Sequence, residues 1–292
     1  MRFTYIESMC NPEFYVPLAQ AAEGAGFHTF AMPDSIIYPK ESDTKYPYTA
    51  DGDREFLEDK PIIDPFSLIA YLGAITTKIR FLPFVMKLPV RNPVLAAKTA
   101  TSIAVLINNR FDWGIGLSPW PEDYTATQTL WEKRGNRFDE MIAIIRGLSG
   151  GDYFEFNGEF YQVPALKLCP TPTQPIPLII GGHSDAALKR AALKGDGWAH
   201  AGGDTAELAK MINRLHALRK EYGREQLPFS IHASSIECFS IDGVKKLADL
   251  GVTDLLIGFQ NTYTKEKDTQ TLEQKLAMLQ GYAEKIIAKV NA

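Results

Sequence analysis

Hydrophobic and polar positions alternate along the chain between short apolar runs and longer stretches with helical spacing. The first run, Arg2–Ile6, is rich in the aromatic and β-branched residues that favour strands. Tyr15–Ala25 then places its apolar residues on one stripe, which is typical of an amphipathic helix, and Gly26 ends it. A second apolar run, His28–Met32, follows at once. The chain is therefore predicted to begin as strand, helix, strand.

The same alternation continues to the end of the chain. Six further strands are predicted, at Ile79–Val85, Arg110–Leu117, Pro177–Ile180, Gly197–His200, Phe229–Ser234 and Asp254–Phe259. The helices between and after them are predicted at Pro65–Thr76, Pro93–Ile107, Glu122–Leu148, Ser184–Lys194, Thr205–Tyr222, Gly243–Leu250 and Thr271–Val290. Alternation of this kind implies a parallel sheet, and about eight β–α units fit a closed (β/α)8 TIM barrel better than the alternative, an open doubly wound sheet. We find no linker, so residues 1–292 are expected to form a single α/β domain.

Two segments depart from this repeat. The stretch Tyr38–Asp59 is polar and too long for an ordinary connection, and such loops are usually functional or disordered. Asp152–Gln162 alternates around Asn157–Gly158, a dipeptide that favours a two-residue hairpin turn. We interpret it as a hairpin inserted into the barrel.

Composition excludes several classes of protein. A net charge of −4 gives no general attraction to nucleic acid or to an anionic membrane. No apolar stretch is long enough to span a bilayer, and the first residues lack the apolar region of a signal peptide. The cysteines Cys10, Cys169 and Cys238 are odd in number and form no CxxC pair, which argues against a disulfide framework or structural zinc. A cytoplasmic protein is expected.

The sequence Gly181–Gly182–His183–Ser184 is the clearest candidate for a binding loop. It follows a predicted strand and opens a predicted helix. Glycine lets a ligand approach the backbone closely, while Ser184 can cap a helix whose first amides attract an anion. A capped tight turn with no ligand explains the same residues about equally well.

Other strand ends carry weaker signals, each with a structural alternative. Gly114 and Gly116 can mark the approach of a ligand ring, although packing explains strand glycines more often. Trp120 and Trp198 can stack on an aromatic cofactor or fill the rim of the barrel. Asp34 is a candidate polar contact to a ligand or a turn residue after proline.

Three kinds of chemistry are disfavoured by missing motifs. The five histidines show no HExxH or other close ligand pair, so no metal site is predicted, although His183 in the glycine loop remains of interest. No GxSxG elbow for a serine hydrolase occurs. No dinucleotide fingerprint or phosphate-binding P-loop occurs either, so a tightly held nicotinamide cofactor is not expected.

Taken together, several segments resemble the bacterial luciferase-like family of flavin- and deazaflavin-dependent oxidoreductases. They occur in the family's order and cover most of the first 200 residues, whereas the last ninety match only in pattern. The segments are AAEGAGFHTFAMPDS (21–35), the stretch from Thr76 to Trp120, RGNRFDEMIAII (134–145), FNGEFYQ (156–162) and PIPLIIGGHSDAALKRAALKGDGW (175–198).

The resemblance implies a homodimeric TIM barrel with a flavin ring in its mouth. It implies that backbone amides near Gly181 and Gly182, together with His183 and Ser184, surround the cofactor phosphate. It also implies a non-proline cis peptide in the third strand, where Phe84–Val85 stands, with Phe84, Val85 and Gly116 lining the ring. Asp34 and Ser35 then become the candidate catalytic residues, and Trp120 and Trp198 the candidate substrate pocket.

The family divides between reduced FMN with oxygen and the deazaflavin coenzyme F420. Segments such as GLSPWPEDY resemble the deazaflavin branch, but many of its members carry His where this chain has Ser35. The two cofactors therefore remain alternatives, and the substrate is expected to be a small organic molecule. Two rival interpretations are a catalytically idle flavin-binding protein and a metal-dependent barrel hydrolase.

Overall fold

A computed structural model describes residues 1–47, 49, 51–260 and 262–290. The strands within them are β1 (Arg2–Ile6), β2 (Thr29–Met32), β3 (Arg80–Pro83), β4 (Met86–Lys87), β5 (Trp113–Gly116), β6 (Phe154–Asn157), β7 (Gln162–Leu166), β8 (Leu178–Gly181), β9 (Gly197–His200), β10 (Ser230–Ala233) and β11 (Asp254–Ile257). The α-helices are α1 (Tyr15–Gly24), α2 (Pro65–Gly73), α3 (Pro93–Leu106), α4 (Pro121–Ala126), α5 (Arg134–Ser149), α6 (Asp185–Lys194), α7 (Thr205–Glu221), α8 (Ile241–Asp249), α9 (Leu272–Tyr282) and α10 (Ala288–Val290).

Within these residues, nine strands form one parallel sheet in the order β3-β2-β1-β11-β10-β9-β8-β5-β4. The two ends of this order are β3, which falls within the predicted strand Ile79–Val85, and β4, which follows it directly; Phe84–Val85 separates the two. Phe81 of β3 also bridges Phe111, just before β5. The sheet therefore closes into a barrel, and the predicted TIM-barrel fold is confirmed.

Alternation along the strands separates two hydrophobic layers. Outward residues such as Phe3, Phe30 and Trp113 pack with the surrounding helices in the main core. Inward residues form a smaller cluster inside the barrel, which consists of Ala31, Leu82, Ile179, Ala199 and Leu256, with Ile6, Phe84 and Val85 packed against it. This is the arrangement expected when successive side chains point to opposite faces of a strand.

Paired charges close the end of the barrel at which the strands begin. Arg2 binds Asp254 with a nitrogen–oxygen distance of 2.6 Å, and Arg80 binds Asp112 at the same distance. Asp254 is also 3.8 Å from the buried ring of His232. Buried charges need partners, so this layer is structural, and function is expected at the opposite end, the mouth, where strands hand over to helices.

The main differences from the sequence prediction lie between β5 and β8, in the helical segment and in the hairpin that follows it. The predicted helix Glu122–Leu148 is two helices, α4 and α5, with Lys133 before α5 at a φ of 51°. The predicted hairpin is present as β6 and β7, but Asn157 pairs with Gln162, so the turn has four residues rather than two. Glu140 of α5 accepts the backbone N–H groups of residues 159–161, which holds this longer turn.

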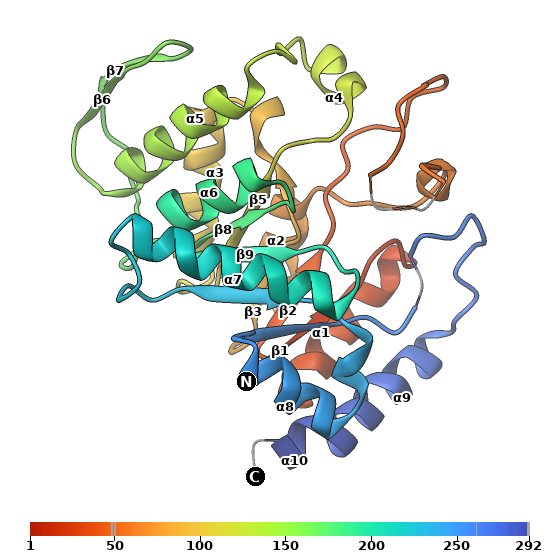
Figure 1. Cartoon of the computed structure of the whole chain (residues 1–292). Coiled ribbons are helices and arrows are strands. Elements are labelled where there is room, and N and C mark those ends of the chain that lie inside the picture. Colours follow the sequence, from red (N-terminus) through yellow and green to blue (C-terminus); the bar gives the residue numbers. More distant parts are fainter. Residues whose placement is uncertain (48, 50, 261, 291–292) are drawn as a thin grey trace.

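Three long connections gather at one side of the barrel. Figure 1 shows the loop after β2 (orange), the segment with α4 and the loop after β11 (blue) on the right, whereas the β6–β7 hairpin projects at the upper left. We call the described residues of the range 33–64 the β2–α2 loop and those of the range 258–271 the β11–α9 loop.

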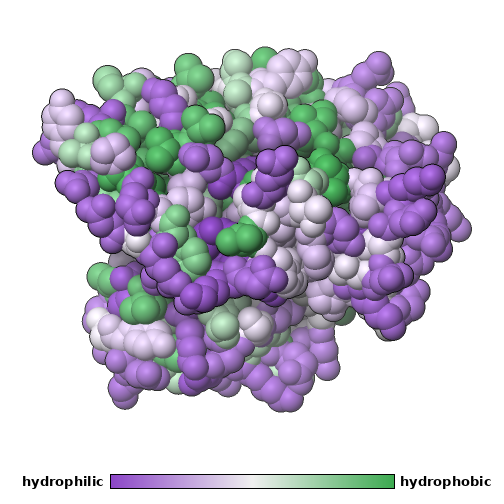
Figure 2. All heavy atoms as spheres, turned by 90° about the horizontal axis from the view of Figure 1, so that it is seen from above, coloured by the Kyte–Doolittle hydropathy of each residue, from purple (hydrophilic) through white to green (hydrophobic). Residues whose placement is uncertain are grey.

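The outer surface seen from above carries hydrophilic residues (purple) over much of its area, with hydrophobic residues (green) in groups between them (Figure 2). Among the described residues, no helix combines the length and the apolar character that crossing a membrane requires.

Candidate active site at the barrel mouth

The inner wall of the mouth is built largely from residues without side chains. Gly116 and Gly181 end β5 and β8, and Gly258 directly follows β11. A Cβ atom added at Gly116 or at Gly181 would lie 2.8 Å from Cγ2 of Val85, closer than carbon atoms approach. Glycine at both positions therefore lets Val85 stand between the two strand ends, and no side chain extends from either of them there.

Val85 belongs to the peptide bond that the family resemblance singled out. Phe84–Val85 is a non-proline cis peptide, as the resemblance implies. Both side chains are partly exposed and pack against the inner cluster of the barrel. The structure thus brings Phe84, Val85, Gly116 and Gly181 together at the base of the mouth.

The double-glycine loop continues from Gly181 into α6. Gly182 has a φ of 120°, and an added Cβ would lie 2.9 Å from the Cβ of Ala187. Ser184 caps α6 by accepting the N–H of Ala187 at 3.2 Å. The first amides of a helix have no partner within the helix, and they favour an anion at its N-terminus. This loop can therefore receive an anionic group beside the glycine-lined space.

Trp198 supports this loop from behind. Its ring is fully buried in the main core, and its Nε1 donates a hydrogen bond of 2.9 Å to the carbonyl oxygen of Gly182. The sequence suggested Trp198 as a wall of the substrate pocket, but the structure places its ring outside the barrel interior. The reason is its register: alternate residues of β9 point outward, and Ala199 is the one that points inward.

A second glycine pair lies beside the first and was missed by the sequence analysis. Gly202 and Gly203 follow β9, the neighbour of β8, with φ values of 99° and 131°. The amide of Ala201 donates to Nε2 of His183 at 3.0 Å, which ties the two loops together. The repeated pattern of an apolar strand followed by two glycines was the available signal.

The histidines of these two loops stack on each other. The ring centroids of His183 and His200 are 4.6 Å apart with 14° between the planes. Burial, and then the neighbouring His183, lower the pKa of His200 to about 4, and burial also lowers the pKa of His183. Both rings are therefore neutral near pH 7, so they give the anion-binding loop no positive charge of their own.

Asp34, predicted as a catalytic candidate, is held in an ion pair. Its side chain is 1 % exposed; both oxygens accept from the Arg91 guanidinium at 2.9 Å, and Oδ2 also accepts the N–H of Lys87 at 2.8 Å. The carboxylate is thereby turned toward the segment that follows Val85 and fixes its position. Ser35 is partly exposed, and its hydroxyl lies 3.5 Å from the carbonyl oxygen of Ile37.

A buried polar network beside Gly116 was also missed. Lys87 pairs in register with Gly116, and its Nζ lies 2.8 Å from Oδ2 of Asp123, with both side chains almost fully buried. Ser118 donates to the same oxygen at 2.5 Å and accepts the N–H of Trp120. The network fixes α4 against the wall of the mouth. It joins segments far apart in the chain, and sequence spacing gives no sign of such a contact.

Trp120 joins an aromatic cluster that reaches across the mouth. Tyr46 of the β2–α2 loop stacks on its ring at 5.1 Å, and Arg54 lies over the same ring at 4.1 Å. Phe56 and Tyr263 complete the cluster, with their centroids 5.3 Å apart. Trp120 is 3 % exposed, and the β2–α2 loop packs on it through Tyr46 and Arg54.

A cavity of about 280 Å³ lies at the β1–β11 side of the mouth. Ser8 and Met9 line it below, Lys60 lines it from the β2–α2 loop, and polar residues of the β11–α9 loop from Gln260 to Gln270 complete it. Serine, threonine, glutamine and lysine side chains predominate in this lining. The cavity is therefore suited to a polar molecule.

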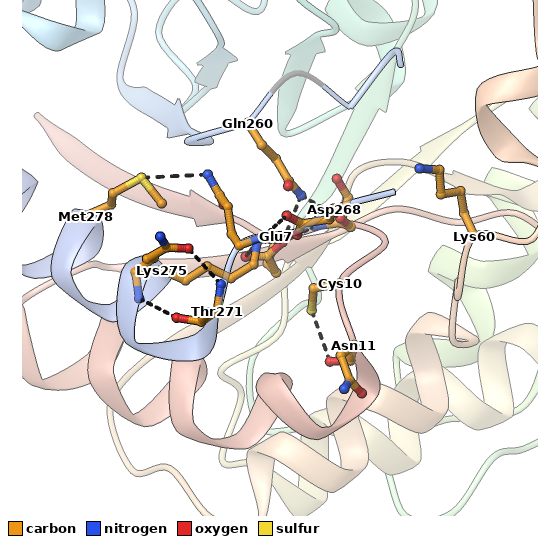
Figure 3. Close-up of polar contacts among 12 residues, drawn as sticks. Glu7, Cys10, Asn11, Lys60, Gln260, Asp268, Thr271, Lys275 and Met278 are labelled. Carbon is orange, nitrogen blue, oxygen red and sulfur yellow. Dashed lines mark hydrogen bonds and ion pairs between the residues drawn. The ribbon is translucent and has the colours of Figure 1, made fainter. Parts of the chain in front are cut away.

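Buried charges form the base of this cavity. Lys275 of α9 lies 3.3 Å from Glu7 and 2.8 Å from Asp268, and Gln260 donates to Glu7 at 3.2 Å. Figure 3 shows Gln260, Asp268 and Lys275 grouped around Glu7. The hydroxyl of Tyr5 also donates to Glu7. The network anchors the end of β1 to α9, and among the residues described, no group of three or more potential metal ligands occurs there or elsewhere.

Comparisons with known proteins agree with this architecture. The sequence model of the family described as luciferase-like monooxygenase matches residues 6–277. An uncharacterized protein of Mycobacterium tuberculosis is 55% identical over 290 residues, which cover 99% of this chain and 100% of that protein.

Two solved structures share the fold over 99% of both chains. Monooxygenase RslO1 from Streptomyces bottropensis superposes with a TM-score of 0.79 at 15% identity. The coenzyme F420-dependent tetrahydromethanopterin reductase from Methanopyrus kandleri superposes with a TM-score of 0.75 at 13% identity. At these identities the likeness concerns the fold.

Proposed function

The chain belongs to the luciferase-like monooxygenase family, and on that premise we propose that it binds FMN or coenzyme F420 in the barrel mouth and catalyses an oxidation–reduction reaction on a small organic molecule. The similar solved structures include a monooxygenase and an F420-dependent reductase. The second of these names matches the F420 alternative.

The observation that carries the proposal is the glycine-lined space above Val85. Cγ2 of Val85 lies only 2.8 Å from the position that a Cβ atom would take at Gly116 or at Gly181. A flat heterocycle can rest on such a surface, because no side chain rises from the two neighbouring strands. The residues present therefore fit the planar ring that both cofactors share.

The loop that follows β8 fits the phosphate that both cofactors carry. Gly181 and Gly182 lead directly into the N-terminus of α6, where Ser184 is the cap. His183 links this loop to the second glycine pair through Ala201. Gly181, Gly182, His183 and Ser184 would hold the phosphate, and Phe84, Val85 and Gly116 would support the ring. When bound, FMN or F420 supplies the electron-transfer chemistry.

The chain's own residues would position the reactants and exclude water. Asp34 acts as a positioning residue, because its bonds to Arg91 and Lys87 fix the segment that leaves Val85. The hydroxyl of Ser35, at the end of β2, is the candidate for a polar contact with the reacting groups. Trp120 and the β2–α2 loop that packs on it would cover the substrate.

The assembly and the location of the protein are further parts of this proposal. The exposed apolar residues Leu95 and Leu106 on α3, with Tyr71 on the neighbouring α2, support a homodimer that buries them. The free thiols of Cys10 and Cys238 and the exposed Cys169 suit a reducing compartment, which supports a cytoplasmic enzyme.

Titration of the purified apo-protein with FMN and with F420, followed by cofactor fluorescence, tests the proposal directly. We expect saturable binding of one cofactor, and binding of neither would contradict the proposal. Reduced cofactor is then mixed with candidate substrates. Faster oxidation with substrate identifies an enzyme, whereas binding without any such acceleration would identify the idle flavin-binding protein.

A further inference from the structure

Two loops meet above the end of β1 and line the cavity there. In the sheet, β1 lies between β2 and β11, so the β2–α2 loop and the β11–α9 loop approach it from opposite sides. The cavity of about 280 Å³ has Ser8 and Met9 below, Lys60 on one side and the β11–α9 loop on the other. Access to it therefore depends on how the two loops are joined.

Among the described residues, the two loops are joined by the ion pairs of one lysine and by the ring of Tyr263, which packs against Phe56 and Tyr46. Lys265 of the β11–α9 loop forms ion pairs with Asp53, at 2.9 Å, and with Glu55. Lys60 donates to the backbone oxygen of Glu266 at 2.5 Å, and the rings of Phe56 and Tyr263 pack edge to face. Figure 3 shows Lys60 apart from the buried group around Glu7.

The other edge of the β2–α2 loop is held more firmly. Glu122 of α4 accepts from the hydroxyls of Ser42 and Thr44 and pairs with Arg54, whose side chain is 10 % exposed. Arg54 and Tyr46 both pack on the buried ring of Trp120. In contrast, the side chain of Lys265 is 58 % exposed. Exposed ion pairs contribute little and are screened by salt, so the Lys265 edge is the one that releases first.

We propose that the β2–α2 loop is a gate, hinged at Glu122 and Trp120 and latched by Lys265, that controls entry of a polar substrate into the cavity beside Ser8. The identity of what enters rests on the proposed function. The gate itself does not, because it is defined by contacts within the chain. Its opening breaks the two ion pairs of Lys265 and separates Tyr263 from the rings of Phe56 and Tyr46, whereas Tyr46 and Arg54 stay packed on Trp120.

A thiol placed in the cavity measures opening without any cofactor or substrate. Ser8→Cys is introduced in a Cys169→Ser background, because Cys169 is the exposed cysteine, whereas Cys10 and Cys238 are buried. Burial also raises the pKa of both Cys10 and Cys238 to about 12, which keeps them unreactive. The rate at which the introduced thiol of Ser8→Cys reacts with the thiol reagent DTNB then reports access to the cavity.

Charge reversal at the latch gives the decisive comparison. We expect Lys265→Glu to accelerate labelling about three- to tenfold, the range expected for the loss of two exposed ion pairs. High salt should accelerate labelling of the protein with an intact latch and slow labelling of the Lys265→Glu protein, because it screens the attraction in the first and the repulsion in the second. Combining Lys265→Glu with Asp53→Lys and Glu55→Lys restores opposite charges and should restore slow labelling.

Lys267 provides the matched control. It lies in the same loop and lines the same cavity, and no ion pair to the β2–α2 loop is found for it among the residues described. Lys267→Glu should therefore leave the labelling rate unchanged. Equal labelling rates with and without the latch, at low and at high salt, would overturn the gate. That result would leave the proposed cofactor site untouched, just as failure of both cofactors to bind would leave the gate intact.

Discussion

His183, in the loop between β8 and α6, and His200, the last residue of β9, stack their imidazole rings with 4.6 Å between centroids. His183 follows Gly181 and Gly182 at the end of β8, and His200 ends β9 and precedes the second glycine pair. The stack therefore ties the loop that we propose to hold the phosphate to the end of β9.

The stack predicts that stability falls in mild acid. Burial and His183 lower the pKa of His200 from 6.5 to about 4 in the folded protein. Between pH 6.5 and 4 the unfolded state thus binds more protons, and the free energy of unfolding decreases as the pH falls through this window. From pH 7 to pH 5 this group alone should remove about 2 kcal/mol.

The asparagine variant of His200 separates this effect from other titrations. Asparagine can still accept the N–H of Gly202, as Nδ1 of His200 does, but it cannot take up a proton. Urea unfolding at pH 7 and pH 5 should show a smaller decrease in His200→Asn than in the parent. His216→Gln, at an exposed position on α7, is the control. Equal decreases in parent and His200→Asn would contradict the prediction.

The fold could be predicted from sequence because its determinants are local. Apolar runs and helical spacing mark the β–α units, and capping residues such as Asp64, Asn92 and Ser184 mark the starts of several of their helices. Eight such units in order leave few alternatives to a closed barrel. The Gly181–Gly182 loop was likewise visible because the strand, the glycines and the helix cap adjoin in sequence.

Contacts between distant segments could not be predicted in this way. The roles of Lys87 and Trp198 depend on which face of the strand each side chain occupies, and a shift of one residue reverses that choice. The partner of Asp34 is 57 positions away, and nothing local in the sequence indicates that Arg91 would claim both of its oxygens.

Filling the base of the mouth should remove cofactor binding. Gly181→Val places a side chain where Val85 already lies, since even a Cβ atom would be 2.8 Å from Cγ2 of Val85. Unlike Gly182, Gly181 has no positive φ, so a bulky residue there tests space rather than backbone strain. We expect binding of both FMN and F420 to weaken by about a hundredfold or more, because the side chain would take the place of the ring.

The control for this variant lies on the surface. Gly281→Val substitutes a glycine of α9 around which an added Cβ would meet nothing within 4 Å. It should bind cofactor as the parent does. The comparison is made by fluorescence titration of both variants, with circular dichroism to confirm folding. Undiminished binding by Gly181→Val would contradict the proposed position of the ring.

The proposed homodimer makes a prediction for α3. Leu95 and Leu106 are 67 % and 73 % exposed, and their spacing of about three helical turns places them on one face of the helix. Charged residues in a buried apolar interface are costly, so Leu95→Glu combined with Leu106→Glu should convert dimers to monomers in light scattering. Leu130→Glu, at a residue of similar exposure outside α2 and α3, should not. A monomeric parent protein would refute the dimer.

Two serine caps distinguish helix stability from anion binding. Ser184 caps α6 at the mouth, and Ser240 caps α8 by accepting the N–H of Gly243 in the same way. Replacing either serine by alanine should lower the free energy of unfolding by about 1 kcal/mol, because each substitution leaves a first-turn amide without its acceptor. The two variants should therefore melt at similarly reduced temperatures.

Only Ser184→Ala should also weaken cofactor binding, because only α6 begins beside the glycine loops and directs its free amides toward the proposed phosphate. Inorganic phosphate should accordingly raise the melting temperature of Ser240→Ala more than that of Ser184→Ala. Equal cofactor affinity in both variants would mean that Ser184 serves α6 alone, and the phosphate would have to be sought elsewhere in the mouth.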